Sequence, residues 1–187
     1  VTWNIDMDAS QQYYATSLQE SKAVGDRVNQ LYSMVNLATL AARRQQFDSA
    51  NIWMQQALPL ALATKDPAME AFCYDNMAFL AEKRLKAPEA FVYYRKASAI
   101  YDTLDKVRYL RTQTRMASLY QSNGKFDSAA VVYEQVVAQS RQLGYSLEQG
   151  DALIALAFQY GLQARYKEGL ALCDSAELLY ANSGNAN

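Results

Sequence analysis

Two arginines four residues apart are the strongest candidates for binding chemistry in this sequence. Arg111 and Arg115 lie in a stretch whose apolar residues recur at helical spacing, so their guanidinium groups share one face of a helix. A guanidinium group pairs well with a carboxylate or another anion. The alternative is that the two arginines pair with Asp75, Glu82 or Asp151 on neighbouring helices, because ion pairs of this kind are common on protein surfaces.

Residues for catalysis are scarce. The 187 residues include no histidine, which excludes Ser-His-Asp and Cys-His nucleophiles, His-ligated zinc and the usual proton shuttle near neutral pH. The carboxylate pairs Asp6/Asp8 and Glu89/Asp102 have no partner general acid and no metal-ligand spacing, and the sequence holds no glycine-rich phosphate loop or Ca²⁺ loop. We therefore predict no catalytic residues, no metal site and no cofactor, and do not expect an enzyme.

Other conspicuous residues have structural explanations. Cys73 and Cys173 stand alone, 100 positions apart, and we expect two small buried thiols. Asp48 and Asp127, each followed by a serine, stand where second helices begin, and we interpret them as helix caps. The 14 tyrosines, at helical spacing, are interpreted as packing between repeats rather than as a stacking platform.

Charge and hydropathy exclude further classes of partner. The 18 basic and 19 acidic residues give a net charge of -1, and no basic stripe indicates nucleic-acid binding. The longest apolar run, Ala57 to Ala63, is far shorter than the roughly 18 residues of a membrane-spanning helix, so we expect no membrane contact. The first residues resemble neither a secretory signal nor a start at Met, so we expect an excised or processed chain. With no targeting segment in the sequence, the cytoplasm and the periplasm both stay open as its compartment.

An internal repeat defines the elements that must position these residues. Small residues occupy positions 50, 90, 129 and 169, which are spaced 40, 39 and 40 apart. The positions twelve residues before and seven residues after each of these also hold small residues, except for Val136. The twelve positions hold Ala38, Ala50, Ala57, Ala78, Ala90, Ala97, Ala117, Ala129, Val136, Ala157, Gly169 and Ala176. Small residues at these spacings let two helices of a hairpin approach closely.

Each unit is predicted to be a helix, a tight turn and a second helix. In the third unit, helical spacing continues to Asn123-Gly124, a helix stop, and a second helix begins near Phe126. Pro59 falls inside a helical pattern, so we expect a kink or an early end near Ala57 and Leu58. The fold class is all-α.

This pattern resembles the tetratricopeptide repeat (TPR), whose unit is usually about 34 residues. Here the units have 39–40 residues, as in the longer repeats of bacterial regulatory proteins, and the glycine before the second helix is present only as Gly124. The resemblance implies a right-handed α-solenoid of about nine helices over residues 1–187. Its parts are a truncated repeat at 6–23, full repeats at 24–64, 65–104, 105–143 and 144–181, and a polar tail at 182–187.

The resemblance also implies a concave groove lined by the first helices, which is where this family usually binds peptides. The register places Tyr32, Thr39, Phe72, Phe79, Lys83, Ser118 and Phe158 in that groove, along with Val35 and Ala42. In one subfamily, an Asn and two basic residues clamp a C-terminal carboxylate, and Asn76, Arg111 and Arg115 match those three positions. The other two members of that clamp, a Lys and an Asn, are Val35 and Thr39 here.

Two functions compete. The first is a non-catalytic scaffold that binds a protein or peptide segment in the groove, as part of a larger bacterial signalling or regulatory protein. The alternative is a homo-oligomeric module, such as a homodimer, that pairs through exposed end helices.

Overall fold

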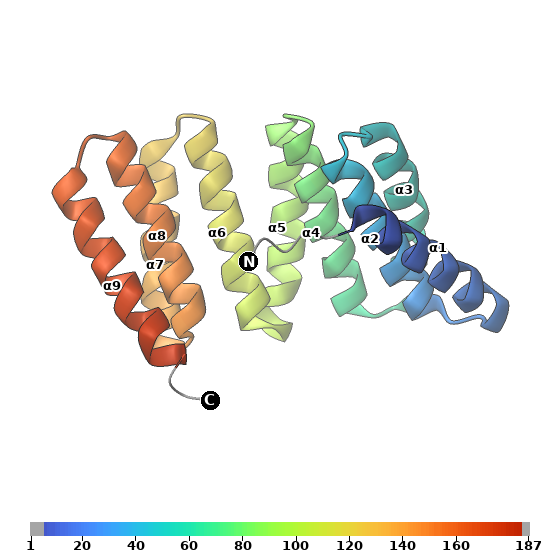
Figure 1. The fold of residues 1–187 in the computed structure, drawn as a ribbon. Coiled ribbons are helices and arrows are strands. Elements are labelled where there is room, and N and C mark those ends of the chain that lie inside the picture. The colour runs from blue at the N-terminus through green and yellow to red at the C-terminus, as the bar shows by residue number, and fades with distance from the viewer. Residues whose placement is uncertain (1–5, 185–187) are drawn as a thin grey trace. The chain divides into compact units, whose positions relative to one another are not determined.

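The computed structural model describes residues 6–184, and this part of the chain consists of nine α-helices without a strand (Figure 1). The all-α prediction is therefore confirmed. The helices are α1 (Met7–Val24), α2 (Arg27–Arg43), α3 (Phe47–Thr64), α4 (Pro67–Lys83), α5 (Ala87–Leu104), α6 (Lys106–Ser122), α7 (Phe126–Leu143), α8 (Ser146–Leu162) and α9 (Tyr166–Gly184). Residues 185–187 of the predicted tail lie outside the described range. None of the helices in this range is long and apolar enough to span a membrane.

The chain forms two compact units whose boundary lies between Ile100 and Tyr101, inside α5. In the first unit α1 packs on α2, α2 pairs with α3, and α3 packs on α4. In the second unit α6 pairs with α7, α7 packs on α8, and α8 pairs with α9. Within each unit, these helices therefore stack so that each one packs against the next in the sequence.

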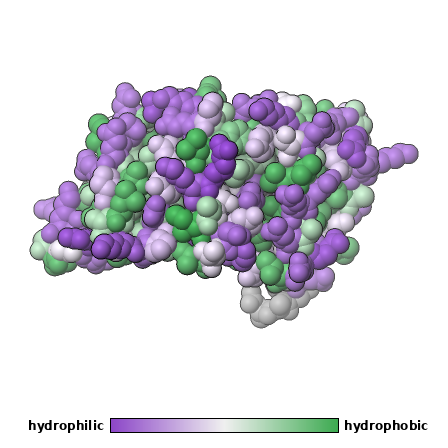
Figure 2. All heavy atoms as spheres, turned by 180° about the vertical axis from the view of Figure 1, so that it is seen from behind, coloured by the Kyte–Doolittle hydropathy of each residue, from purple (hydrophilic) through white to green (hydrophobic). Residues whose placement is uncertain are grey.

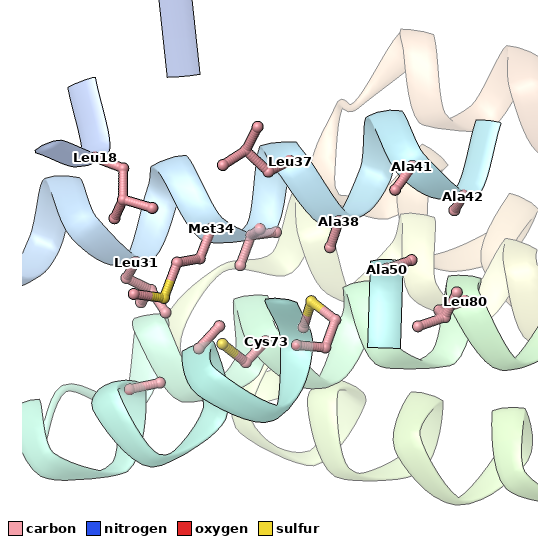
Figure 3. Close-up of a cluster of buried hydrophobic side chains, with 14 of the residues drawn as sticks. Leu18, Leu31, Met34, Leu37, Ala38, Ala41, Ala42, Ala50, Cys73 and Leu80 are labelled. Atoms are coloured by element: carbon pink, nitrogen blue, oxygen red, sulfur yellow. The ribbon is translucent and has the colours of Figure 1, made fainter. Parts of the chain in front are cut away.

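The small residues of the repeat are buried between helices. All twelve predicted positions are buried. At one of them, a Cβ added to Gly169 would lie 3.0 Å from the carbonyl oxygen of Ala157, so α8 and α9 approach to backbone contact. Larger apolar residues fill the remaining space, and Figure 3 shows Leu31, Met34 and Cys73 among the buried side chains of the first unit.

Aspartates begin most of the first helices of the hairpins. The carboxylates of Asp26, Asp66 and Asp105 accept hydrogen bonds of 3.0, 2.8 and 3.0 Å from the amides of Asn29, Ala68 and Arg108. Each carboxylate satisfies one of the amides that the first helical turn leaves without a partner. These aspartates are spaced by the repeat, 40 and 39 residues apart, which is the signal that could have identified them from the sequence.

The predicted caps Asp48 and Asp127 were wrong. The helices α3 and α7 begin two residues earlier than such caps require, after Gln46 and Lys125, and neither end has a capping hydrogen bond from a side chain. Both aspartates instead lie in the first helical turn, where a negative charge interacts favourably with the helix dipole.

The turns inside the hairpins repeat one left-handed geometry with different residues. Gln45, Leu85, Gly124 and Ala164 have φ values of 61°, 57°, 73° and 59°. In each turn the next amide bonds back to the preceding helix, for example Lys125 to the carbonyl of Tyr120 at 2.9 Å. Only glycine adopts this conformation without steric cost, so three of the four turns are strained in exchange for the same hairpin geometry.

Two further expectations were wrong in part. The early end expected near Ala57 and Leu58 does not occur, because α3 continues through Pro59 to Thr64. The proline removes one backbone donor, and the burial of Ala57 and Ala61 on the same helix offsets that loss. Cys173 is exposed, although Cys73 is buried. At the position of Cys173, the preceding second helices carry Met54, Tyr94 and Tyr133, which are buried; within the described residues, no helix follows α9 to cover that face.

Candidate functional site

The first helices of the first unit carry an aromatic and polar face. The rings of Tyr32 on α2 and Phe72 on α4 are 5.2 Å apart and tilted by 53°. The Nζ of Lys83 lies 5.3 Å from the centre of the Phe79 ring, within reach of a cation–π interaction. Four of the groove candidates on α2 and α4 therefore contact one another in pairs.

Thr39 and Asn76 meet on the same face. The amide of Asn76 donates to the carbonyl of Phe72 at 2.8 Å, and its Oδ1 lies 3.4 Å from the hydroxyl of Thr39. That hydroxyl is closer to the carbonyl of Val35, at 2.9 Å, so its proton favours the helix backbone. Val35 and Ala42, expected in the groove, are instead buried in the core of the first unit, because the helix turns their side chains toward the neighbouring helices.

In the second unit an ion pair joins α6 to α8. The Nη2 and Nε atoms of Arg111 lie 2.8 and 3.1 Å from Oε1 of Glu148. The Glu148 side chain is only 7% exposed, whereas that of Arg111 is 58% exposed. A buried carboxylate needs such a partner, because removing a charge from water without compensation is costly. The inner edge of Arg111 is thus fixed to the protein, and the rest of its side chain reaches solvent.

Glu148 was not among the partners expected from the sequence. Glu82 accepts a hydrogen bond from the hydroxyl of Tyr94 at 2.9 Å, and Asp151 accepts one from the hydroxyl of Tyr180 at 2.7 Å. At the position of Glu148, the first three repeats have Asn29, Met69 and Arg108, of which only Met69 is buried. Because burial varies at this position, the repeat register alone gives no signal for a buried carboxylate at Glu148.

A hollow of about 240 Å³ lies beside this ion pair. It is lined by Arg111, Thr114 and Arg115 on α6 and by Glu148 and Asp151 on α8. The hydroxyl of Thr114 donates to the carbonyl of Leu110 at 3.0 Å, which leaves its oxygen lone pairs as acceptors. The two arginines singled out from the sequence therefore line one hollow together. Asn76 belongs to the first unit.

Tyr180, which does not line the hollow, donates a hydrogen bond to Asp151. Burial and the hydrogen bond to Asp151 raise the pKa of Tyr180 to about 12, so its hydroxyl stays protonated and donates at neutral pH. Its ring lies over Gly150, where an added Cβ would stand 2.7 Å from Cζ. The absence of a side chain at Gly150 therefore creates the space from which Tyr180 reaches Asp151.

The remaining groove candidates of the second unit are exposed. Phe158 on α8 is 64% exposed, and Ser118 on α6 is also exposed, with its hydroxyl near Tyr133. On the face drawn in Figure 2, hydrophobic residues form small patches separated by hydrophilic ones. Within residues 6–184, no group of three or more His, Cys, Asp or Glu side chains could hold a metal ion.

The arrangement of the helices is shared with solved structures of TPR-like repeat proteins. No family model and no curated protein matches the sequence. A TPR-like repeat structure of a putative kinesin light chain from Podosopora anserina superposes with a TM-score of 0.69 at 18% identity, over 96% of this chain and 95% of that one. For MamA the TM-score is 0.61 at 15% identity, over 96% and 92% of the two chains.

A third structure, a Rap protein complexed with competence and sporulation factor, has a TM-score of 0.75 at 12% identity. The alignment covers 97% of this chain and 61% of the Rap chain. At these identities the likeness defines the fold. The protein is an all-α array of TPR-like hairpins, and the resemblance seen in the sequence is confirmed.

Proposed function

We propose that this protein is a non-catalytic scaffold that binds a segment of another protein against the exposed faces of its first helices. The observation that carries the proposal is the hollow between α6 and α8, where Arg111 is held in place by a buried carboxylate. An ion pair of this geometry orients a guanidinium group before a ligand arrives, which lowers the entropy lost on binding.

The first unit supports the same proposal. Tyr32, Phe72 and Phe79 offer partly exposed rings beside the polar groups of Asn76 and Thr39, which is the mixture of anchors found where proteins bind peptides. The structurally similar Rap protein was solved in complex with competence and sporulation factor. We infer a comparable role for this chain in a larger bacterial signalling or regulatory protein.

The test is capture of partners by the purified chain. The informative variant is Arg111→Gln with Glu148→Gln, because replacing both members avoids leaving a buried charge without its partner. Arg115→Gln is added to remove the second positive charge from the hollow. We expect this triple variant to lose the partners that the native chain retains. A control with Arg141→Gln and Lys167→Gln removes two exposed charges from α7 and α9 and should retain them; equal retention by both variants would overturn the hollow as the binding site.

A homodimer is the second candidate, and the outer face of α9 favours it. Leu170 and Leu178 are 64% and 65% exposed, and Cys173 is exposed between them. Light scattering over a range of concentrations tests this proposal. A mass that rises to twice that of the chain, and returns to the monomer value in Leu170→Glu, would support it, whereas a constant monomer mass would exclude it.

A further inference from the structure

In the hollow of the second unit, Arg111 and Asp151 carry opposite charges and are held by different partners. Arg111 and Asp151 occupy the same register position of successive repeats, 40 residues apart, as do Tyr32 and Phe72 in the first unit. The two aromatic residues contact each other. Arg111 instead binds Glu148, and Asp151 binds Tyr180, so each charged group is held by a different partner.

The formal charges of the residues that line the hollow cancel. Arg111 and Arg115 contribute two positive charges, and Glu148 and Asp151 contribute two negative ones. An anion without a positive group would be attracted by the arginines but repelled by the two carboxylates. A cation without a negative group would be attracted by the two carboxylates but repelled by the two arginines. The ligand that benefits from both sides carries both signs of charge, with its cation toward Asp151 and its carboxylate toward Arg111.

The size of the hollow limits the ligand further. A volume of about 240 Å³ is below the range of ordinary small-molecule pockets. The hollow therefore has room for one residue-sized group and not for several side chains at once. Thr114 adds acceptor lone pairs on α6, suited to a third contact from an N–H donor.

We propose that this hollow binds a residue-sized group that carries both a carboxylate and a cationic nitrogen. Two sources share that chemistry: a lysine or arginine at the free C-terminus of a bound chain, and a free basic amino acid. The inference rests on the proposed scaffold function and specifies the ligand of its second unit. It assigns Asp151 as the residue that selects the cation, and Tyr180 as a positioning residue for Asp151.

The direct test uses fluorescein-labelled hexapeptides that differ only at the last residue. One ends in lysine with a free carboxylate, the second in lysine amide, and the third in leucine with a free carboxylate. We expect the first to bind at least tenfold more tightly than either of the others by fluorescence anisotropy. Equal binding of the lysine and leucine acids would overturn the proposal, because the cation would then contribute nothing.

Two aspartate variants test whether the preference for the lysine acid arises in the hollow. Asp151→Asn keeps the shape and an acceptor for Tyr180, and we expect it to weaken the lysine acid about tenfold while changing the leucine acid less than twofold. Asp174→Asn, on α9, removes the same charge outside the hollow and should change neither. An equal loss for both peptides in Asp151→Asn would overturn the assignment of Asp151.

Tyr180 has its own readout. Tyr180→Phe removes only the hydroxyl, and we expect it to weaken the lysine acid about threefold without affecting the leucine acid. A merely structural tyrosine would affect both peptides equally, and that result would overturn the positioning role.

Competition by free L-lysine distinguishes the two sources. If L-lysine displaces the labelled peptide at concentrations near the peptide's own dissociation constant, the ligand is a free amino acid; if it needs a concentration a hundredfold higher, the ligand is a chain end. Either result supports the two-charge chemistry. A partner retained through Arg111 whose binding is indifferent to its terminal charges would overturn this inference but leave the scaffold function intact.

Discussion

The two units of this protein use one backbone design to present different chemistry. At the same register position, the first unit has Tyr32 and Phe72, whose rings contact each other, and the second has Arg111 and Asp151, which bind other partners and border a hollow. The buried small residues beneath these faces are nearly the same in both units. In a repeat fold, the positions that set helix packing and those that face a ligand are separate, so surface chemistry varies without altering the scaffold.

The largest expected effect concerns the buried small residues that both units share. Ala78→Leu in the first unit and Ala117→Leu in the second should each lower the free energy of unfolding by about 3 kcal/mol, because both sites are fully buried at helix contacts. Urea denaturation measures the loss. Ala99→Leu and Ala138→Leu, at exposed positions of α5 and α7, serve as controls and should change stability by less than about 0.5 kcal/mol.

The second effect is specific to the second unit. Arg111→Ala should cost about 2 kcal/mol, since it leaves the buried carboxylate of Glu148 without its partner. Adding Glu148→Gln should recover more than half of that loss, because the neutral amide is less costly to bury. Chemical denaturation of the single and double variants gives the coupling; two independent, additive losses would show that the pair is not energetically linked.

The third effect is a pH dependence that belongs to the first unit. Burial raises the pKa of Cys73 from 9.0 to about 12, so the folded chain keeps the neutral thiol where the unfolded chain ionises. Stability from this group is fully present below pH 9 and is lost as pH rises through 12, with a slope of at most about 1.4 kcal/mol per pH unit. Denaturation between pH 8 and 11 should show a shallower decline in Cys73→Ala than in the native chain; parallel declines would contradict this.

The fourth effect concerns a core position at which one repeat of the second unit differs from the other three. Leu40, Leu80 and Leu119 are buried there, whereas the fourth repeat has Gln159, whose Nε2 donates to the carbonyl of Phe126 and whose Oε1 is buried without a partner. Gln159→Leu should therefore stabilise the chain by about 1 kcal/mol, measured by the thermal midpoint. The reverse change, Leu80→Gln, should destabilise it, and stabilisation there would refute the explanation.

The smallest effect lies in the hairpin turns. Leu85→Gly should raise stability by about 0.5 kcal/mol, because relief of the left-handed strain exceeds the added freedom of the unfolded chain. Gly124→Ala, at the matching turn of the second unit, should lower stability by about 1 kcal/mol. Calorimetry of the pair checks the sign, and two changes of the same sign would show that the turns are not equivalent.

Much of the fold could be predicted because its determinants are local and repeated. The twelve small residues predicted buried positions between helices, and the Asn123-Gly124 pair predicted the end of a helix that stops at Ser122. Arg111 and Arg115 were predicted to share one helix face, and they line the same hollow. The cap at Asp48 failed because the helix begins at Phe47, two residues before the start that a cap at Asp48 requires, a difference too small for spacing alone to determine.

The sequence by itself determined the all-α repeat, its unit length and the small residues that hold the hairpins together, because the period of the repeat and the helical spacing are both written along the chain. Only the tertiary structure decided which carboxylate holds Arg111, that Tyr180 reaches Asp151 across Gly150, and that Cys173 is exposed. Those outcomes depend on how neighbouring helices are rotated and on which faces remain uncovered, and no spacing within a single helix specifies either.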